Sequence, residues 1–261
     1  MIAGLAPATV VVLVLAALVV GFSKTAVAGL GPVATVLFTL VMSAHDATGA
    51  VLVLLIACDL VAVVAYRRSC DWRLIRVLMP SLVVGIMLGA WCLTLLDDVA
   101  LRRTIGALLL AMGLMQLAQE VQSQRGRGAT DEQPADVGQE SQAPGRAVGL
   151  LAGSAAGFTT MTANAAGPVM AIYLLHLRVP KLLFVGTSAW FYCLANLVKL
   201  PFAIGIGLVH PGSLWLNLAL VVPALVGCAL GLKVLPHIPQ RVFDRLALAL
   251  AIGSSLLLLL R

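Results

Sequence analysis

The sequence predicts an all-α polytopic membrane protein made of two inverted-topology repeats of about five hydrophobic segments each. Composition, the spacing of the apolar runs and a motif that occurs twice support this fold class. Of the 261 residues, 61% are hydrophobic and 11% are charged, and the mean hydropathy is +1.05. Such a chain has too little polar surface to cover a soluble globule. The runs show no strand-like alternation, so they predict helices rather than a barrel.

The apolar runs form two groups of five. They cover about 5–22, 26–43, 47–66, 74–96 and 101–118, and then about 147–161, 164–177, 183–206, 213–234 and 243–260. Because some runs are short or interrupted, we expect eight to ten segments. The polar stretch between the groups cannot bury enough apolar surface to fold. We therefore expect a first repeat over 1–118, a flexible cytoplasmic linker over 119–146 and a second repeat over 147–261.

A motif rich in glycine and hydroxyl groups opens each half. Its copies begin Gly21-Phe22-Ser23-Lys24 and Gly157-Phe158-Thr159-Thr160, and they end Gly31-Pro32 and Gly167-Pro168. A helix from Thr9 to Met42 would be about 50 Å long, too long for one span and tight for two. The chain must therefore break at Gly21, Gly29, Gly31 and Pro32, as two short spans or a re-entrant hairpin. Such breaks are where two-repeat transporters keep their binding site.

The connections predict that the halves are inverted. Four arginines place 67–76 in the cytoplasm, whereas the equivalent connection 207–213 has no Lys or Arg. The distribution of basic residues is the opposite at the preceding connection: 43–46 in the first half lacks basic residues, whereas its counterpart 178–181 in the second half contains two. Both termini are then outside and the linker inside, with the arginines at 102–103 as an exception. The fourth segments also repeat, and their glycines are expected at close helix contacts: Gly85, Gly89, Gly227 and Gly231.

Several polar residues near the motifs are candidates for binding a substrate. Lys24 directly follows an apolar run, where a charge is costly unless it snorkels, pairs or meets a ligand. Its repeat counterpart, Thr160, lies in the most hydroxyl-rich stretch of the chain. A cation, hydroxyls and backbone N–H groups freed by glycine suit an oxyanion. The candidates from the two motifs are Ser23, Lys24, Thr159, Thr160 and Asn164.

Asp59 lies too deep in the third run to reach water easily. It either forms a structural ion pair, with Lys199 or Lys24, or takes part in substrate or proton coupling. Its repeat counterpart is Asn196, and Lys199 shares a helix face with Asn196. We take Asn196 and Lys199 as further substrate-binding candidates and Asp59 as the candidate for proton coupling.

Thr187 and Ser188 open the helix that carries Asn196. They are candidates for the same site, or they only bond back to their own helix. Five scattered cysteines without a C-x-x-C pair predict neither a disulfide framework nor a zinc site, and Cys58 and Cys193 are expected to pack as small apolar residues. The histidines lack a metal-ligand spacing.

The sequence favours a transporter without a metal or cofactor. Walker A, H-E-x-x-H and G-x-S-x-G motifs are absent, so the energy must come from a gradient. The net charge of +6 is explained by basic connections and implies no nucleic-acid partner. The expected partners are a small anion and the lipid bilayer, and the sequence leaves the oligomeric state open, a homo-oligomer included.

A set of short motifs runs in order along nearly the whole chain: Gly21-Phe22-x-Lys24, Gly31-Pro32, Asp59-Leu60, Tyr66-Arg67-Arg68, Asp71-Trp72-Arg73, Gly157 to Met161, Asn164 to Pro168, Tyr173-Leu174, Gly186 to Ala189 and Asn196-x-x-Lys199-Leu200-Pro201. Taken together, these motifs resemble the TauE/SafE family of sulfite and organosulfur-anion exporters. The resemblance implies a multi-pass permease of the bacterial inner membrane that exports sulfite, sulfoacetate or related anions. Export of another small anion or metabolite, and an intramembrane enzyme, remain the alternatives.

The inverted topology can be tested with alkaline phosphatase fusions, since the enzyme is active only outside the cytoplasm, where its disulfides form. We expect fusions at Ser69 to be inactive and fusions at Pro211 to be active, because only the first connection is basic. Equal activity at the two positions would rule the inversion out.

Overall fold

A computed structural model describes residues 7–26, 34, 37–38, 41, 44–95, 110, 114, 145–207, 209 and 211–260. In the first half it contains α1 (Pro7–Thr25), α3 (Ala44–Tyr66) and α4 (Trp72–Leu95). In the second half it contains α6 (Arg146–Ala163), α7 (Ala166–His176), α8 (Lys181–Gly205), α9 (Pro211–Val234), the short 3₁₀ helix η3 (Leu235–His237) and α10 (Gln240–Leu260). The described residues form helices and no strands, which confirms the all-α class.

The helices agree with eight of the ten predicted apolar runs. Five described stretches are long and apolar enough to cross a membrane: Pro7–Thr25, Gly49–Tyr66, Trp72–Cys92, Lys181–Gly205 and Leu216–His237. The runs predicted at 26–43 and 101–118 lie outside the described residues, apart from positions 26, 34, 37–38, 41, 110 and 114. So does the predicted linker 119–146, except for its last two residues.

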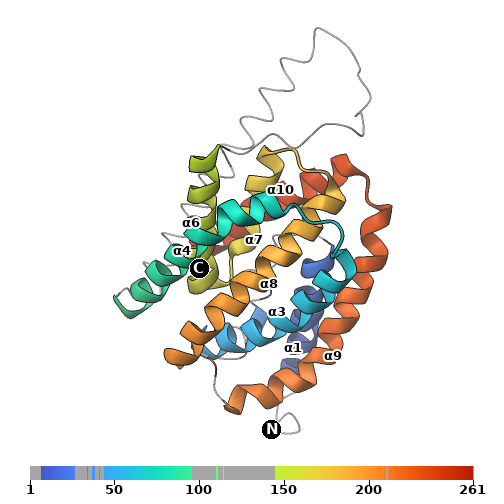
Figure 1. Cartoon of the computed structure of the whole chain (residues 1–261). Coiled ribbons are helices and arrows are strands. Elements are labelled where there is room, and N and C mark those ends of the chain that lie inside the picture. Colours follow the sequence, from blue (N-terminus) through green and yellow to red (C-terminus); the bar gives the residue numbers. More distant parts are fainter. Residues whose placement is uncertain are drawn as a thin grey trace, which may run out of the picture.

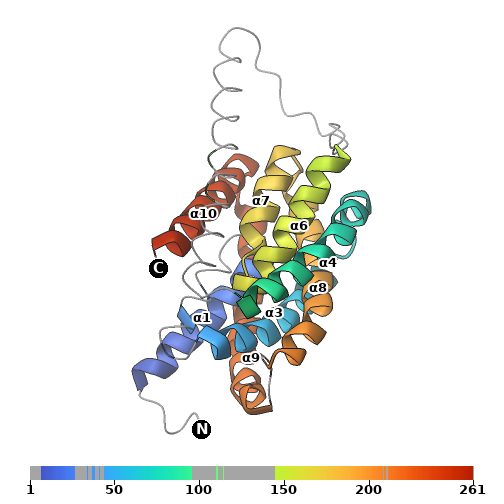
Figure 2. The same cartoon turned by 90° about the vertical axis from the view of Figure 1, so that its left-hand side faces the viewer.

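The first helix of each half packs against the fourth segment of the other half. α1 lies along α9 and α6 lies along α4, while α3 contacts both α8 and α9. Figure 1 shows α1, α3 and α9 grouped together, with α4, α6 and α7 on the other side of α8, and Figure 2 shows the same grouping after a quarter turn. Each of the two helices that carry a motif is therefore held against the other half of the chain.

Glycines allow these exchanged contacts to be close. A Cβ on Gly21 would overlap the carbonyl oxygen of Ala224 on α9, and a Cβ on Gly157 would overlap that of Leu82 on α4. The glycines predicted at helix contacts on α4 and α9 likewise lie close to the motif helices. An added Cβ would contact Ser154 and Phe158 from Gly85, Phe158 and Met161 from Gly89, Leu18 and Phe22 from Gly227, and Phe22 and Thr25 from Gly231. The α1 residues that contact the glycines of α9 are the repeat counterparts of the α6 residues that contact the glycines of α4. The same packing arrangement therefore occurs twice.

One break predicted from the glycines is wrong. α1 continues through Gly21 to Thr25, and α6 continues through Gly157 to Ala163. Both glycines serve close packing instead, because a helix without a Cβ at that point can approach its neighbour's backbone. The other predicted break residues of the first motif, Gly29, Gly31 and Pro32, lie outside the described residues.

In the second motif the helix does break, three residues after Met161. Asn164 ends α6 in the left-handed region, with φ 52° and ψ 31°, and α7 begins at Ala166. α7 has 11 residues, about 16 Å of helix, which is half of a ~30 Å hydrocarbon core. The second repeat thus contains the broken segment that the sequence predicts.

The equivalent connections after α3 and α8 lie at opposite ends of α8. The backbone N–H of Asp71, just after α3, donates to Thr187 Oγ1 near the start of α8 at 2.9 Å. The α8–α9 connection follows the far end of this 25-residue helix, about 27 Å along the helix from Thr187. This is the arrangement that inverted repeats need, although the orientation of either half in a membrane stays a prediction.

Gly21 offers a test of the close packing. Gly21→Ala should lower the free energy of unfolding by about 1–3 kcal/mol, because its Cβ meets backbone that cannot move aside easily. Gly253→Ala on α10 is the matched control, since a Cβ there meets nothing within 4 Å. Thermal unfolding of the purified proteins in detergent measures both, and equal melting temperatures would contradict the contact.

Candidate functional site

A buried ion pair joins two charged residues deep in the described part of the first half. Lys24 on α1 and Asp59 on α3 approach to 2.6 Å between Nζ and Oδ1. Asp59 is fully buried and the Lys24 side chain is only 9% exposed. Either charge alone would be very costly in such surroundings, so each makes the burial of the other tolerable. Of the two ion-pair partners left open by the sequence, the structure has Lys24.

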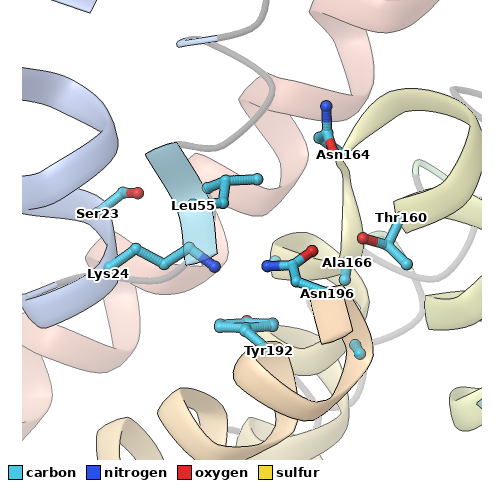
Figure 3. A pocket seen from close by; sticks show the side chains of 10 residues that line it. Ser23, Lys24, Leu55, Thr160, Asn164, Ala166, Tyr192 and Asn196 are labelled. Atoms are coloured by element: carbon cyan, nitrogen blue, oxygen red, sulfur yellow. The ribbon is translucent and has the colours of Figure 1, made fainter. Parts of the chain in front are cut away.

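The second oxygen of Asp59 is bound by its own repeat counterpart. Asn196 on α8 donates from Nδ2 to Asp59 Oδ2 at 2.6 Å. Figure 3 shows the ends of the Lys24 and Asn196 side chains directed toward one another. Because residues at equivalent repeat positions touch here, this carboxylate lies where the two halves meet.

Tyr192 completes the surroundings of the Lys24 ammonium. Its ring lies on α8, one turn before Asn196, with its centroid 4.5 Å from Lys24 Nζ. A cation over an aromatic face is attracted by the negative ring face, and more strongly when both are shielded from water. Sequence reasoning missed Tyr192, and its position four residues before Asn196 on one helix face was the available signal.

Lys199 stabilises the broken end of α6. Its ammonium donates to the backbone oxygen of Thr160 at 2.6 Å and to Asn164 Oδ1 at 2.5 Å. The last carbonyls of a helix lack partners and carry partial negative charge, so a buried cation is favourable there. The predicted candidate Lys199 thus contacts the second motif directly, and it does so as a cap of α6.

A small cavity of about 30 Å³ lies between the motifs and α8. That is room for about one or two waters. Five predicted candidates line it, together with apolar or aromatic neighbours; the lining residues are Ser23, Lys24, Leu55, Thr160, Asn164, Ala166, Gly167, Tyr192, Ala195 and Asn196. Both motifs and α8 therefore contribute residues to one cavity, whose polar groups stand among apolar neighbours.

The remaining candidates do not line this cavity. Thr159 Oγ1 donates back to the carbonyl of Ala155 at 2.8 Å, which is the helix back-bonding that competes with a site role. Thr187 Oγ1 accepts a hydrogen bond from the backbone N–H of Asp71, in the connection after α3. The neighbouring Gly186 has no Cβ, which leaves room for the backbone of Ser69 in the same connection. Ser188 is buried one turn before Tyr192, on the same helix.

The charges favour an anion in or beside the cavity. Two lysines, Lys24 and Lys199, and one carboxylate, Asp59, give the cluster a net charge of +1 when all three are ionised. Hydroxyl, amide and aromatic groups supply further partners. Within the described residues, no three His, Cys, Asp or Glu side chains gather as metal ligands would. The arrangement can hold a small anion by charge and hydrogen bonding.

The cap on α6 can be tested by stability. Lys199→Met removes both hydrogen bonds and leaves buried oxygens of Thr160 and Asn164 without this donor, so we expect a loss of about 1–3 kcal/mol. Lys233→Met, at an exposed position of α9, should change little. Thermal unfolding in detergent compares the two, and an unchanged Lys199→Met protein would show that the cap contributes nothing.

Comparison with known proteins agrees with this architecture. The family model described as "Sulfite exporter TauE/SafE" matches residues 13–258, nearly the whole chain. No curated protein and no solved structure gives a significant match. The match covers both motifs, the ion pair and all the described helices in part or in full. The chain therefore belongs to the TauE/SafE family of sulfite exporters and is a multi-pass membrane transporter.

Proposed function

We propose that this protein exports small sulfur-containing anions, such as sulfite, sulfoacetate or related organosulfonates, across the bacterial inner membrane. The observation that carries the proposal is the Lys24 ammonium at a buried cavity lined by both repeated motifs. The family supports the class of cargo, and the net positive cluster supports an anion. The substrate binds in this cavity, and transport follows alternating access: the cavity opens to one side of the membrane at a time.

In this proposal the anion binds among Ser23, Lys24, Thr160, Asn164 and Asn196. Lys24 provides the charge, and the hydroxyl of Thr160 and the amides of Asn164 and Asn196 provide hydrogen bonds to the oxygens of the anion. Ser23 lines the space, but its hydroxyl donates back to the carbonyl of Val20 at 2.8 Å. Lys199 acts through its hold on the α6 end rather than by direct contact. Thr159 and Thr187, whose hydroxyls bond elsewhere, support the helices that form the site.

Asp59 couples the cycle to protons. While Asp59 is ionised, it neutralises Lys24 and competes with an incoming anion for the same ammonium. A proton on Asp59 removes that competition, so Lys24 becomes available when the carboxyl is neutral. Asn196 continues to hold the protonated group through an amide contact. Low pH on the loading side should therefore promote anion binding.

The orientation follows from basic residues at one end of the bundle. Asp71 bonds to Thr187, and Lys181 bonds to the carbonyl oxygens of Leu235 and Ile238, so the connections 67–71, 177–180 and 235–239 share that end. These connections and adjoining turns contain many arginines and lysines. We propose that this end faces the bacterial cytoplasm.

The role of Lys24 is tested by sulfite flux in vesicles that contain the purified protein. Lys24→Gln should lower the flux about tenfold or more, because a charged partner of the anion is lost. Lys24→Arg should retain part of it, and the exposed Lys233→Gln is the matched charge control. Normal flux in Lys24→Gln protein would show that the lysine serves the fold alone.

The same vesicles test the coupling. Wild-type flux should rise as pH falls on the loading side, whereas Asp59→Asn, which resembles the protonated acid, should keep binding and lose this dependence. A purely structural pair has another signature, poor expression of Asp59→Asn with rescue by Lys24→Gln. Gradient-driven flux like that of the wild type in Asp59→Asn protein would eliminate the coupling role.

A further inference from the structure

The last turn of α1, which carries Lys24, is held from two sides. The hydroxyl of Tyr66 on α3 donates to the backbone oxygen of Thr25 at 2.8 Å, and Thr25 Oγ1 donates to the carbonyl of Cys228 on α9 at 2.9 Å. Thr25 is fully buried and Tyr66 is nearly so. The last carbonyls of a helix have no partner within it, so the Tyr66 hydroxyl satisfies a group that water does not reach.

Tyr66 shares a face of α3 with Asp59. The two residues are seven positions apart, which is about two helical turns or 10 Å along the helix. Asp59 pairs with the ammonium of Lys24, and Tyr66 bonds to the carbonyl of the next residue, Thr25. One face of α3 therefore binds both the side chain of Lys24 and the backbone beside it.

The equivalent helix end in the second half is held by a different kind of group. Lys199 on α8 donates to the backbone oxygen of Thr160, the repeat counterpart of Lys24. The repeat counterpart of Lys199 is Ala62, which lies on α3 one turn before Tyr66. In the second half the cation is thus the group that holds the helix end. In the first half a neutral phenol does so, which leaves the Lys24 ammonium directed at Asp59 and the cavity.

We propose that Tyr66 is a positioning residue for Lys24, because its hydroxyl keeps the last turn of α1 where the ammonium reaches both Asp59 and the cavity. The effect on the anion rests on the proposed function. Without the hydroxyl, the Thr25 carbonyl loses its donor and the turn shifts on α3, so the ammonium is placed less often at the cavity. The bond from Thr25 to Cys228 remains, so α1 stays docked on α9 and the protein folds.

Sulfite flux in vesicles measures the effect on the anion. Tyr66→Phe keeps the ring and removes only the hydroxyl. The sulfite concentration for half-maximal flux should rise about fivefold while maximal flux stays within about twofold, since binding depends on the placement of Lys24. A role in folding alone would lower the amount of working protein, and hence only the maximal flux. An unchanged half-maximal concentration would therefore overturn the proposal.

Tyr173→Phe on α7 is the matched control for the flux measurement. Tyr173 is 3% exposed, and its hydroxyl has no hydrogen-bond partner within the described structure. Removal of this hydroxyl breaks no contact with α1, so both flux values should stay as in the wild type. A rise in the half-maximal concentration equal to that of Tyr66→Phe would show that any buried phenol has this effect, and would also overturn the proposal.

A thermodynamic cycle tests the positioning without sulfite. Tyr66→Phe is made in the wild type and in a chain whose ion pair is removed by Lys24→Gln with Asp59→Asn, and each protein is unfolded by heat in detergent. The Thr25 carbonyl loses its donor in both, but only the wild type also loses ion-pair geometry. The melting temperature should therefore fall at least about twice as far in the wild type. Equal falls in the two chains would overturn the proposal. Absence of sulfite flux in the wild type would count against the proposed function instead, and the cycle would still decide the role of Tyr66.

Discussion

The arrangement of this bundle depends on the cost of placing a charge among apolar helices. Asp59 is fully buried, and it is tolerable there only because Lys24 and Asn196 reach it from α1 and α8. The three helices that meet at this carboxylate come from both halves. Their relative positions are therefore limited by two contacts of 2.6 Å, which is a tighter condition than apolar packing sets. The cavity, the aromatic ring of Tyr192 and the α6 cap are all arranged around it.

Close backbone packing brings these polar groups together. Gly21 lets α1 approach α9, and Gly157 lets α6 approach α4, so the two motif helices are held from outside by the opposite half. Small residues serve this purpose in membranes, where lipid is as apolar as a leucine side chain and contact area has to come from close approach. The polar ends of α1 and α6 then lie near one another beside α8, although they are far apart in sequence.

Hydropathy, repetition and charge placement made most of the fold predictable, since a bilayer permits few ways to satisfy a backbone. They also singled out Lys24, Asp59 and Asn196, because charged and amide groups in apolar runs are conspicuous. Pairings were not predictable. One-dimensional spacing could not choose between Lys24 and Lys199, since that choice depends on how α1 and α8 pack. Nor could it show that Thr187 bonds to the connection after α3, or that Gly21 lies inside a helix.

The contact between Asp59 and Asn196 bears on how such a protein can descend from a duplicated half. An ancestor with identical halves would place the same residue on both sides of this contact, 2.6 Å apart in the present structure. Two carboxylates there would repel, and one would have to stay protonated. Two amides would leave Lys24 without its counter-charge. One acid and one amide at these two positions avoid both problems, because the amide donates to the carboxylate while the carboxylate still pairs with Lys24.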